Sequence, residues 1–370
     1  MTEVPLRVLH LVGSEVSSHL ADLSRLYAAD CLAATADPER YEVHLAVVAP
    51  GGLWRFPTDL GEAAVAAAEA VPVERAVQVL TDLAPDVAVP QMFCLPGMTT
   101  YRSLLDLLGI PFVGQTPEAM AVAAHKARAK AVVAGAGVRV PAGQLLRRGE
   151  TPTVPLPAVV KPVDADNSVG VALVRDTGEY DEALRAAYER SAEVLVEEYV
   201  ELGREVRCGV VERDGELVGL PLEEYAVSRD AKPIRGEDDK LRRTASGELD
   251  LVAKDAEHAW IVDPADPLTA RVQEAARACH RALGCRDYSL FDFRVDADGQ
   301  PWFLEAGLYC SYAEKSVVVV MARAAGIALP DLFRSGLDQA LARRRPRSTS
   351  SPATSPATTS PAAATTGSPA

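Results

Sequence analysis

The sequence lacks the features of a membrane-spanning, zinc-stabilised or secreted protein. Its most apolar run, Val317–Ala322, is far shorter than the roughly 20 residues that a transmembrane helix needs. Its six cysteines are scattered and form no CxxC pair, which argues against a structural zinc site and is typical of thiols in a reducing cytoplasm. The N-terminus has acidic Glu3 and no cleavage site after a basic region, so it resembles a first buried strand rather than a signal peptide. We therefore expect a cytoplasmic protein.

Positive charge is also in short supply. The 370 residues carry 38 basic and 52 acidic side chains, for a net charge of −14, which argues against nucleic acid or an anionic membrane as the main partner. A polyanionic small molecule would fit only if cations and a metal gathered at one site. With 48% hydrophobic and 24% charged residues, the composition indicates a globular chain of two or three domains.

The first part of the chain alternates short apolar strands with helices. We predict strands at 7–12, 41–49, 86–90 and 110–113, and helices at 18–34, 62–70, 74–83 and 100–108. This alternation predicts a parallel sheet covered on both faces. Ligands of such sheets lie beyond the carboxyl ends of the strands, where segments 13–17 and 91–94 fall here.

The later part predicts an α+β arrangement. A helix at 117–134 is basic on one face, and 177–190 and 268–283 are further predicted helices. We predict strands at 158–161, 170–174, 193–199, 205–212, 288–295 and 301–305, with a hairpin turn at Asp214-Gly215. Segment 226–247 is highly charged without periodicity and is predicted to be a loop or an insertion. The last 25 residues, from 346, contain only Ser, Thr, Pro, Ala and Gly apart from Arg347, and we predict a disordered tail.

One segment has the composition of a phosphate-binding loop. Lys161 closes an apolar strand, and the loop that follows contains Asn167, Ser168 and Gly170. Backbone amides of small residues can cradle phosphate oxygens, and a lysine supplies a point charge. Taken alone, however, this pattern is more typical of a hairpin tip with a solvated lysine.

A second apolar strand runs into acidic residues. It contains Glu197 and Tyr199, and Glu205 follows. Such a strand can line an adenine pocket, with a side chain and the neighbouring backbone bonding the base and a later carboxylate bonding the ribose. The alternative is a strand end with solvated acids.

Two carboxylates lie in apolar surroundings on strands joined by a short hairpin. They are Asp292, in the run LFDFRV, and Glu305, in WFLEAG. A buried carboxylate without a partner is very costly, so a shared hard cation such as Mg²⁺ is the favoured explanation. A pair of salt-bridged structural acids is the alternative.

In order and spacing these segments resemble the ATP-grasp superfamily, and specifically its D-alanine–D-alanine ligase branch. The resemblance covers the chain apart from its tail and is strongest from about 126 to 333. The motifs that carry it are HKARAK, VVKPVDADNSVGV, VLVEEYV, DLVAK, GCRDYSLFDFRVDADGQPWFLEA and MARAAGIALPDLF, with LGIPFVGQTPEA in the looser N-terminal part.

The resemblance implies a fold, a reaction and a set of roles. ATP would lie between two α+β subdomains, a carboxylate would be phosphorylated to an acylphosphate, and an amine would attack it. Lys126 and Lys161 would contact phosphates, Asn167 and Ser168 would belong to the loop covering them, and Lys254 would approach the transferred phosphate. Glu197, Tyr199 and Glu205 would hold adenine and ribose, and Asp292 and Glu305 would bind Mg²⁺. Family members are often dimers through the N-terminal domain, although no interface can be read from this sequence.

Departures from the family fall at the end of the site that receives the substrates. The metal-binding Asn expected two residues after Glu305 is Gly307, and the oxyanion arginine expected before Asp292 is Leu290. Arg294 and Arg207 are the candidates to replace that arginine. Ser316 stands where a carboxylate-binding serine would fall, Ser311 lies in the changed segment before it, and Glu15 could receive an amino group. Helix capping by Ser14 or Ser17 explains the Glu15 segment equally well.

We therefore predict an ATP-grasp enzyme of mixed α/β and α+β class. The predicted units are an N-terminal α/β domain at 1–116, a small central subdomain at 117–200, a C-terminal subdomain with the metal site at 201–345, and the tail. Because the departures affect the substrate end, the leading hypothesis is a ligase that joins unusual amino acids, using ATP and Mg²⁺. The alternatives are a D-alanine–D-alanine ligase proper and a degenerate, non-catalytic nucleotide-binding protein.

Overall fold

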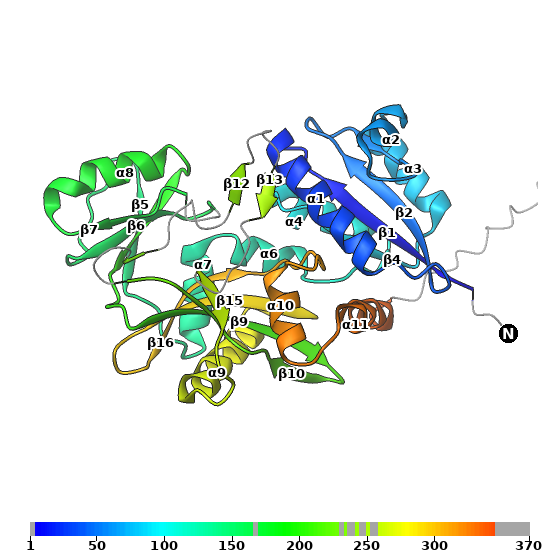
Figure 1. Cartoon of the computed structure of the whole chain (residues 1–370). Coiled ribbons are helices and arrows are strands. Elements are labelled where there is room, and N and C mark those ends of the chain that lie inside the picture. Colours follow the sequence, from blue (N-terminus) through cyan, green and yellow to red (C-terminus); the bar gives the residue numbers. More distant parts are fainter. Residues whose placement is uncertain are drawn as a thin grey trace, which may run out of the picture.

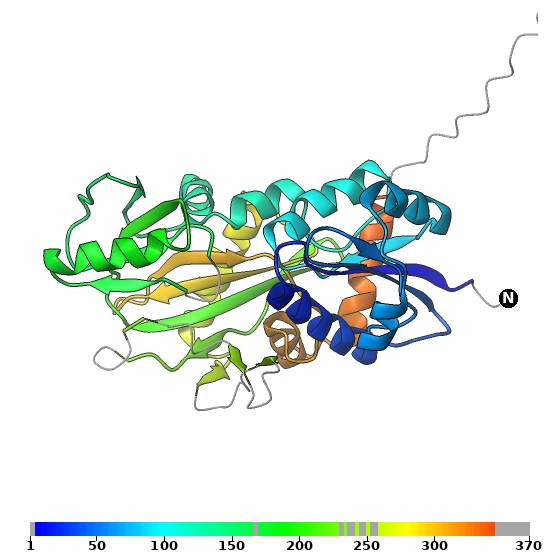
Figure 2. The same ribbon diagram turned by 90° about the horizontal axis from the view of Figure 1, so that it is seen from above.

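Three main sheets follow one another along the chain. The computed structural model describes residues 4–165, 169–228, 233–234, 241–243, 249–251 and 258–344 (Figure 1). The N-terminal sheet and the small central sheet lie at opposite ends of the molecule, and the third sheet runs between them (Figure 2). No helix in the described part of the chain is both long enough and apolar enough to cross a membrane.

The N-terminal sheet has the order β3-β2-β1-β4, in which β2, β1 and β4 are parallel. This confirms the predicted parallel sheet. The predicted strand at 110–113 was too long, because only one bridge, Ala88 to Phe112, extends the sheet there. The elements are β1 (Leu6–Gly13), α1 (Ser18–Ala34), β2 (Tyr41–Val48), β3 (Trp54–Arg55), α2 (Glu62–Ala67), α3 (Val73–Leu83), β4 (Val87–Pro90), α4 (Leu95–Met98) and α5 (Thr100–Leu107).

The small central sheet is antiparallel and has the order β5-β8-β6-β7. The helix α8 covers it, and residues such as Leu146, Val160 and Ala187 form its own core. The elements are β5 (Gly143–Arg147), β6 (Ala158–Pro162), β7 (Ala172–Val174), the 3₁₀ helix η1 (Thr177–Glu179), α8 (Tyr180–Tyr188) and β8 (Glu193–Glu198).

The third sheet has the order β14-β11-β9-β15-β16, with β10 paired to β9 as the predicted hairpin at Asp214-Gly215. A short separate pair, β12 and β13, includes part of the segment predicted to be a loop. The elements are β9 (Arg204–Arg213), β10 (Glu216–Gly219), β11 (Glu223–Tyr225), β12 (Leu241–Arg243), β13 (Leu249–Leu251), β14 (Ala259–Ile261), α9 (Pro267–Ala282), β15 (Tyr288–Val295), β16 (Pro301–Gly307), α10 (Val317–Ala324) and α11 (Leu329–Ala342).

The predicted basic helix at 117–134 is in fact two helices, α6 (Pro117–Ala123) and α7 (Lys126–Gly135). His125 begins α7 because its Nδ1 accepts a hydrogen bond from the Arg128 backbone amide. Both helices share a core with the third sheet, against Phe291 and Phe303, rather than with the central sheet. The boundaries of the predicted units stay a prediction, but α6 and α7 pack with the C-terminal one.

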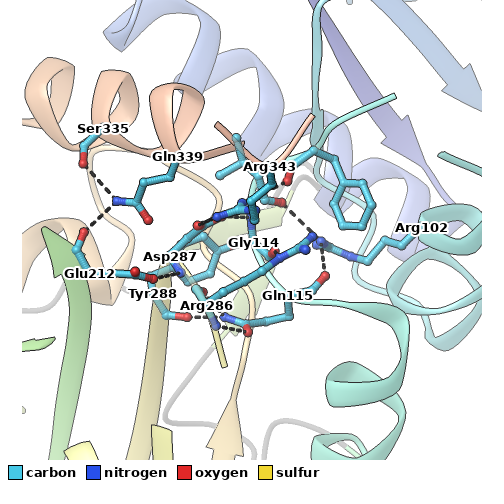
Figure 3. A network of polar contacts seen from close by, with 12 residues as sticks. Arg102, Gly114, Gln115, Glu212, Arg286, Asp287, Tyr288, Ser335, Gln339 and Arg343 are labelled. Atoms are coloured by element: carbon cyan, nitrogen blue, oxygen red, sulfur yellow. Dashed lines mark hydrogen bonds and ion pairs between the residues drawn. The ribbon is translucent and has the colours of Figure 1, made fainter. Parts of the chain in front are cut away.

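A network around Asp287, which we call the Asp287 junction, fastens the C-terminal helix to the loop after α5 (Figure 3). Arg343 of α11 donates to both Asp287 carboxylate oxygens, at 2.6 and 2.8 Å, and the Gly114 amide donates to one of them at 2.6 Å. Gln115 exchanges hydrogen bonds with the Arg286 backbone, at 2.8 and 2.9 Å. The Asp287 side chain is only 1% exposed. The junction therefore holds α11 in a fixed position against the loop after α5.

Candidate active site

Two neighbouring strands of the third sheet form the floor of a cleft that is lined by charged side chains such as Lys161, Glu205 and Asp292. In the antiparallel register, Arg294 of β15 lies opposite Glu205 of β9, and Asp292 lies opposite Arg207. Because side chains alternate along a strand, all four share one face, while Phe291 and Phe293 enter the core on the other face.

The floor therefore carries two cross-strand ion pairs. In one pair β15 supplies the arginine, and in the other β9 supplies it. Arg294 Nη2 lies 3.0 Å from Glu205 Oε2, and both side chains are buried. Arg294 also donates to the Val200 and Pro233 carbonyls, at 3.1 and 2.5 Å, and lies over the Tyr199 ring. These contacts hold Arg294 at the Glu205 end, so its guanidinium is directed away from the role expected beside Asp292.

Arg207 is the cation that contacts Asp292. Its Nε lies 2.5 Å from Asp292 Oδ1 and its Nη2 lies 3.0 Å from Oδ2, a bidentate pair. The guanidinium also lies over the Tyr225 ring, 5.2 Å from its centroid. Of the two arginines that sequence reasoning offered, Arg207 is the one beside the candidate metal carboxylate.

One wall of the cleft is a chain of buried charges on Glu197. Its two carboxylate oxygens contact Lys161 and Lys130, the latter at 2.6 Å, and Lys130 Nζ also donates to the Phe303 carbonyl at 3.0 Å. Burial raises the pKa of Glu197, but the two lysines outweigh this effect and hold the pKa below its usual range. Burial also lowers the pKa of Lys130 to about 8, against the opposing effect of Glu197.

Sequence reasoning assigned Glu197 to adenine and did not select Lys130. The structure gives Glu197 a different environment, because its carboxylate is engaged by two lysines that come from α7 and β6. Lys130 could have been found from its spacing, since it stands four residues after Lys126 and so on the same helix face.

The two predicted metal carboxylates lie opposite each other. Asp292 pairs with Glu305 across β15 and β16, which confirms the predicted neighbouring strands. Lys126 Nζ lies 3.5 Å from Glu305 Oε2 and 2.5 Å from the Ala165 carbonyl. In the described residues, no group of three or more His, Cys, Asp or Glu side chains is placed to hold a metal. Two carboxylates fit Mg²⁺ nevertheless, because this ion usually takes one or two from the protein and completes its shell with waters and substrate phosphates.

The two departures from the family pattern face each other in this sheet. Leu290 lies opposite Gly307 on one side and Gly209 on the other. Its Cδ2 is 3.9 Å from where a Gly307 Cβ would stand. Leu290, between two glycines, thus stands where an arginine was expected opposite an asparagine at position 307.

Glu15 follows the carboxyl end of β1, in the N-terminal part of the molecule. Gly13 precedes it with φ +102°, and a Cβ there would lie 2.1 Å from the Val48 carbonyl oxygen, so only glycine fits this turn. Glu15 is half-buried, and Oε2 accepts a hydrogen bond from the Tyr101 hydroxyl at 2.7 Å. Ser17 caps α1, as the alternative explanation proposed, and the substrate role of Glu15 stays a prediction.

The candidate substrate serines differ in their surroundings. Ser311 is buried, its carbonyl accepts from Gln91 Nε2 at 2.8 Å, and its hydroxyl accepts from the Ala313 amide. Ser316 is half-exposed at the start of α10, makes no side-chain capping bond there, and has its hydroxyl 3.8 Å from Cys310 Sγ. Ser316 is therefore the better placed of the two to meet a ligand. Lys254, Asn167 and Ser168 lie outside the described residues.

Comparison with known proteins identifies the family of the chain. Residues 144–337 match the family model described as D-ala D-ala ligase C-terminus. The chain is 32% identical over 237 residues to D-alanine–D-alanine ligase from Citrifermentans bemidjiense, covering 62% of this chain and 70% of that protein. It is 31% identical over 265 residues to vancomycin B-type resistance protein VanB from Enterococcus faecalis, covering 70% and 74%.

Solved structures show the same fold over nearly the whole chain. The VanG D-Ala:D-Ser ligase from Enterococcus faecalis aligns with a TM-score of 0.71 at 22% identity, covering 91% of this chain and all of that one. D-alanine–D-alanine ligase from Bacillus anthracis aligns with a TM-score of 0.68 at 21% identity, covering 92% and 98%.

The relatives and the fold show an ATP-grasp enzyme of the ligase class, as predicted. The chain belongs to the D-alanine–D-alanine ligase family.

Proposed function

We propose that this enzyme joins two amino acids through an amide bond at the expense of ATP. The observation that carries the proposal is the arrangement of the cleft. Asp292 and Glu305 lie opposite each other, Lys126 of α7 contacts Glu305, and Lys161 of β6 contacts Glu197. The family relationship supplies the reaction class, and the cleft supplies the charges that this class requires.

The reaction has two steps. A carboxylate oxygen of the first amino acid bonds to the γ-phosphorus of ATP, the bond to the β–γ bridging oxygen breaks, and ADP leaves. The amine nitrogen of the second amino acid then bonds to the acyl carbon, the bond from this carbon to the oxygen that bridges it to phosphorus breaks, and phosphate leaves with that oxygen. The amine gives up a proton. Both steps depend on positioning and charge neutralisation rather than on a covalent protein nucleophile.

The residues of the cleft divide these tasks. We assign the ribose to Glu205, held in place by Arg294, and the phosphates to Lys126 and Lys161, with Glu197 positioning Lys161. Tyr199 and the end of β8 would flank the base. Asp292 and Glu305 would hold Mg²⁺, which when bound would neutralise phosphate charge.

The substrates would meet the cleft from the N-terminal side. Glu15, oriented by the Tyr101 hydroxyl, is proposed to receive an amino group, and Ser316 a carboxylate. Ser311 would then support the loop that carries Ser316. The roles that the family resemblance gives to Asn167, Ser168 and Lys254 remain part of the proposal, as do a cytoplasmic location and a homodimer.

The changed substrate end favours amino acids other than two D-alanines. Leu290 and Gly307 replace a polar pair on adjoining strands, and the chain continues with Leu308 and Tyr309. We therefore place the enzyme in specialised biosynthesis rather than in cell-wall synthesis.

A substrate panel tests the proposal. Purified enzyme, ATP and Mg²⁺ are incubated with pairs of L- and D-amino acids, including D-alanine alone, and phosphate release is followed together with product mass. We expect ADP, phosphate and one condensed product, and none with Asp292→Asn. Turnover with D-alanine alone would restore the cell-wall assignment. ATP binding by calorimetry without turnover for any pair would identify a degenerate, non-catalytic relative.

A further inference from the structure

The contact between Arg207 and Asp292 uses the atoms that a cation would need. Arg207 donates to both Asp292 carboxylate oxygens, at 2.5 and 3.0 Å. The two side chains are only 13% and 12% exposed, so little water is present to screen them. A guanidinium fork and a divalent cation cannot occupy the same two oxygens at close range, because their positive charges repel in a site of low dielectric.

Arg207 must therefore leave at least one Asp292 oxygen before a cation binds there. A buried arginine that loses its carboxylate is costly unless another anion replaces it. The guanidinium has limited freedom, because it lies over the Tyr225 ring at 5.2 Å and its strand is paired on both sides. A replacement anion would have to come to it in the cleft.

The N-terminal side of Arg207 is where the substrates are proposed to enter. Tyr27 of α1 is close enough for the charge of Arg207 to act on its phenol, opposing the burial that raises the pKa of Tyr27 to about 12. Tyr27 packs edge-on against Phe93, 5.3 Å between centroids, and Phe93 packs against Tyr309. Arg207 thus contacts Asp292 directly and acts electrostatically on Tyr27 of the N-terminal part.

We propose that Arg207 exchanges partners during the reaction. In the nucleotide-free enzyme it neutralises Asp292, and once a cation takes the Asp292 oxygens it pairs with an anionic oxygen of the substrate, the carboxylate or the acylphosphate formed from it. This inference rests on the proposed function. It explains how the chain manages without an arginine at position 290, because the required charge comes from the adjoining strand, one cross-strand pair away.

Metal binding without turnover tests the first half of this exchange. Mn²⁺ serves as the probe, and its dissociation constant is measured by electron paramagnetic resonance on the full chain without nucleotide or amino acid. Arg207→Gln removes the competing charge, so we expect Mn²⁺ to bind at least 10-fold more tightly than in the native enzyme. Arg294→Gln is the matched control, because it removes an arginine paired to Glu205 rather than to Asp292, and we expect a change of less than 3-fold.

Turnover tests the second half. In Arg207→Gln we expect kcat for phosphate release to fall at least 100-fold while the KM for ATP changes less than 3-fold. Arg207→Lys keeps the charge without the fork, so it should bind Mn²⁺ with intermediate affinity and recover part of kcat, and it replaces the Gln variant if that one does not fold. Unchanged or weaker Mn²⁺ binding in the folded variants would overturn the exchange, as would an unchanged kcat.

The two proposals fail in different ways. If the native enzyme released no phosphate with any amino acid, the proposed function would fall, and the Mn²⁺ comparison would still decide whether Arg207 and a cation compete for Asp292. If turnover were found but Arg207→Gln left Mn²⁺ binding unchanged, the exchange alone would fall.

Discussion

The Asp287 junction and the floor of the cleft both contain a bidentate arginine–aspartate pair, yet the two pairs are built for different purposes. Arg343 and Asp287 close a junction in which a backbone amide also donates to the carboxylate, and the Asp287 side chain is 1% exposed. Arg207 pairs with Asp292, which lines an open cleft beside a second carboxylate, Glu305. The Asp287 carboxylate is enclosed by protein groups, whereas the Asp292 carboxylate has oxygens that a ligand in the cleft can reach.

The role of a buried ion pair therefore depends on whether protein encloses it or a cleft gives a ligand access to it. Such pairs contribute little net stability when formed, because desolvation offsets their attraction, but breaking one by removing a partner is costly. A pair closed on all sides therefore fixes the register between segments. A pair at a cleft keeps a charge neutralised until a ligand arrives.

The sharpest separation between the two regions should come from Glu305→Gln. It removes one of two charges proposed to hold Mg²⁺ without disturbing the junction, so we expect phosphate release to fall by roughly 10³-fold, about 4 kcal/mol at the barrier. The free energy of unfolding in urea should change by less than about 1 kcal/mol. Glu314→Gln, at an exposed position, serves as the control and should retain full activity. Retained activity in Glu305→Gln would remove Glu305 from the metal site.

The junction should show the reverse behaviour in Asp287→Ala. Arg343 and the Gly114 amide lose their acceptor, and we expect the free energy of unfolding to drop by about 3–5 kcal/mol. ATP affinity of the folded variant, measured by calorimetry at low temperature, should be unchanged. Asp331→Ala removes the exposed partner of Arg334 on the same helix and should cost about 1 kcal/mol or less. A small loss in Asp287→Ala would show that the junction is not a fastening.

Acid should weaken the region beside the junction. Burial lowers the pKa of His280 to about 4, and its Nδ1 lies 2.8 Å from the Ser289 hydroxyl. Between pH 6.5 and 4 the unfolded chain binds a proton at His280 that the native chain does not, so stability is present above this window and is lost as the pH falls through it. From pH 7 to 5 we expect His280 to account for about 2 kcal/mol of lost stability. Urea unfolding at both pH values should show a smaller loss in His280→Gln, and an equal loss would contradict a neutral buried imidazole.

The smallest effect should come from the other ion pair of the cleft floor. Glu205→Gln removes the carboxylate charge assigned to the ribose and weakens the pairing with Arg294, so we expect the KM for ATP to rise about 10-fold with little change in kcat. Steady-state phosphate release at varied ATP measures both constants. A fall in kcat at unchanged KM would assign Glu205 to the chemistry instead.

Local sequence patterns were sufficient to predict the bounds of elements that have a clear periodicity of their own. Helix α1 and strand β15 have the predicted bounds, Ser18–Ala34 and Tyr288–Val295. The pairing of Asp292 with Glu305 was also predictable, because a short hairpin leaves two strands little choice of partner.

Long-range contacts decided the rest. The break between α6 and α7 has no glycine or proline to announce it, and it depends on His125, whose Nε2 lies 3.3 Å from Glu193, and on the Lys126 amide, which donates to the Val163 carbonyl. Arg207 could not be placed beside Asp292 from sequence, because five strands, β10 to β14, and helix α9 separate β9 from β15 along the chain. Only their register shows that Glu205-x-Arg207 and Asp292-x-Arg294 are complementary.

Two long-range hydrogen bonds, one of them from the lysines that engage Glu197, affect how the enzyme becomes functional after synthesis. Lys130 donates to the Phe303 carbonyl across 173 positions of sequence, and Gln91 donates to the Ser311 carbonyl across 220. Contacts of such separation carry the largest loop-closure cost and form late in folding. A refolding chain should therefore regain its helices well before it regains the ability to bind nucleotide, and no fragment ending before β16 can assemble the cleft.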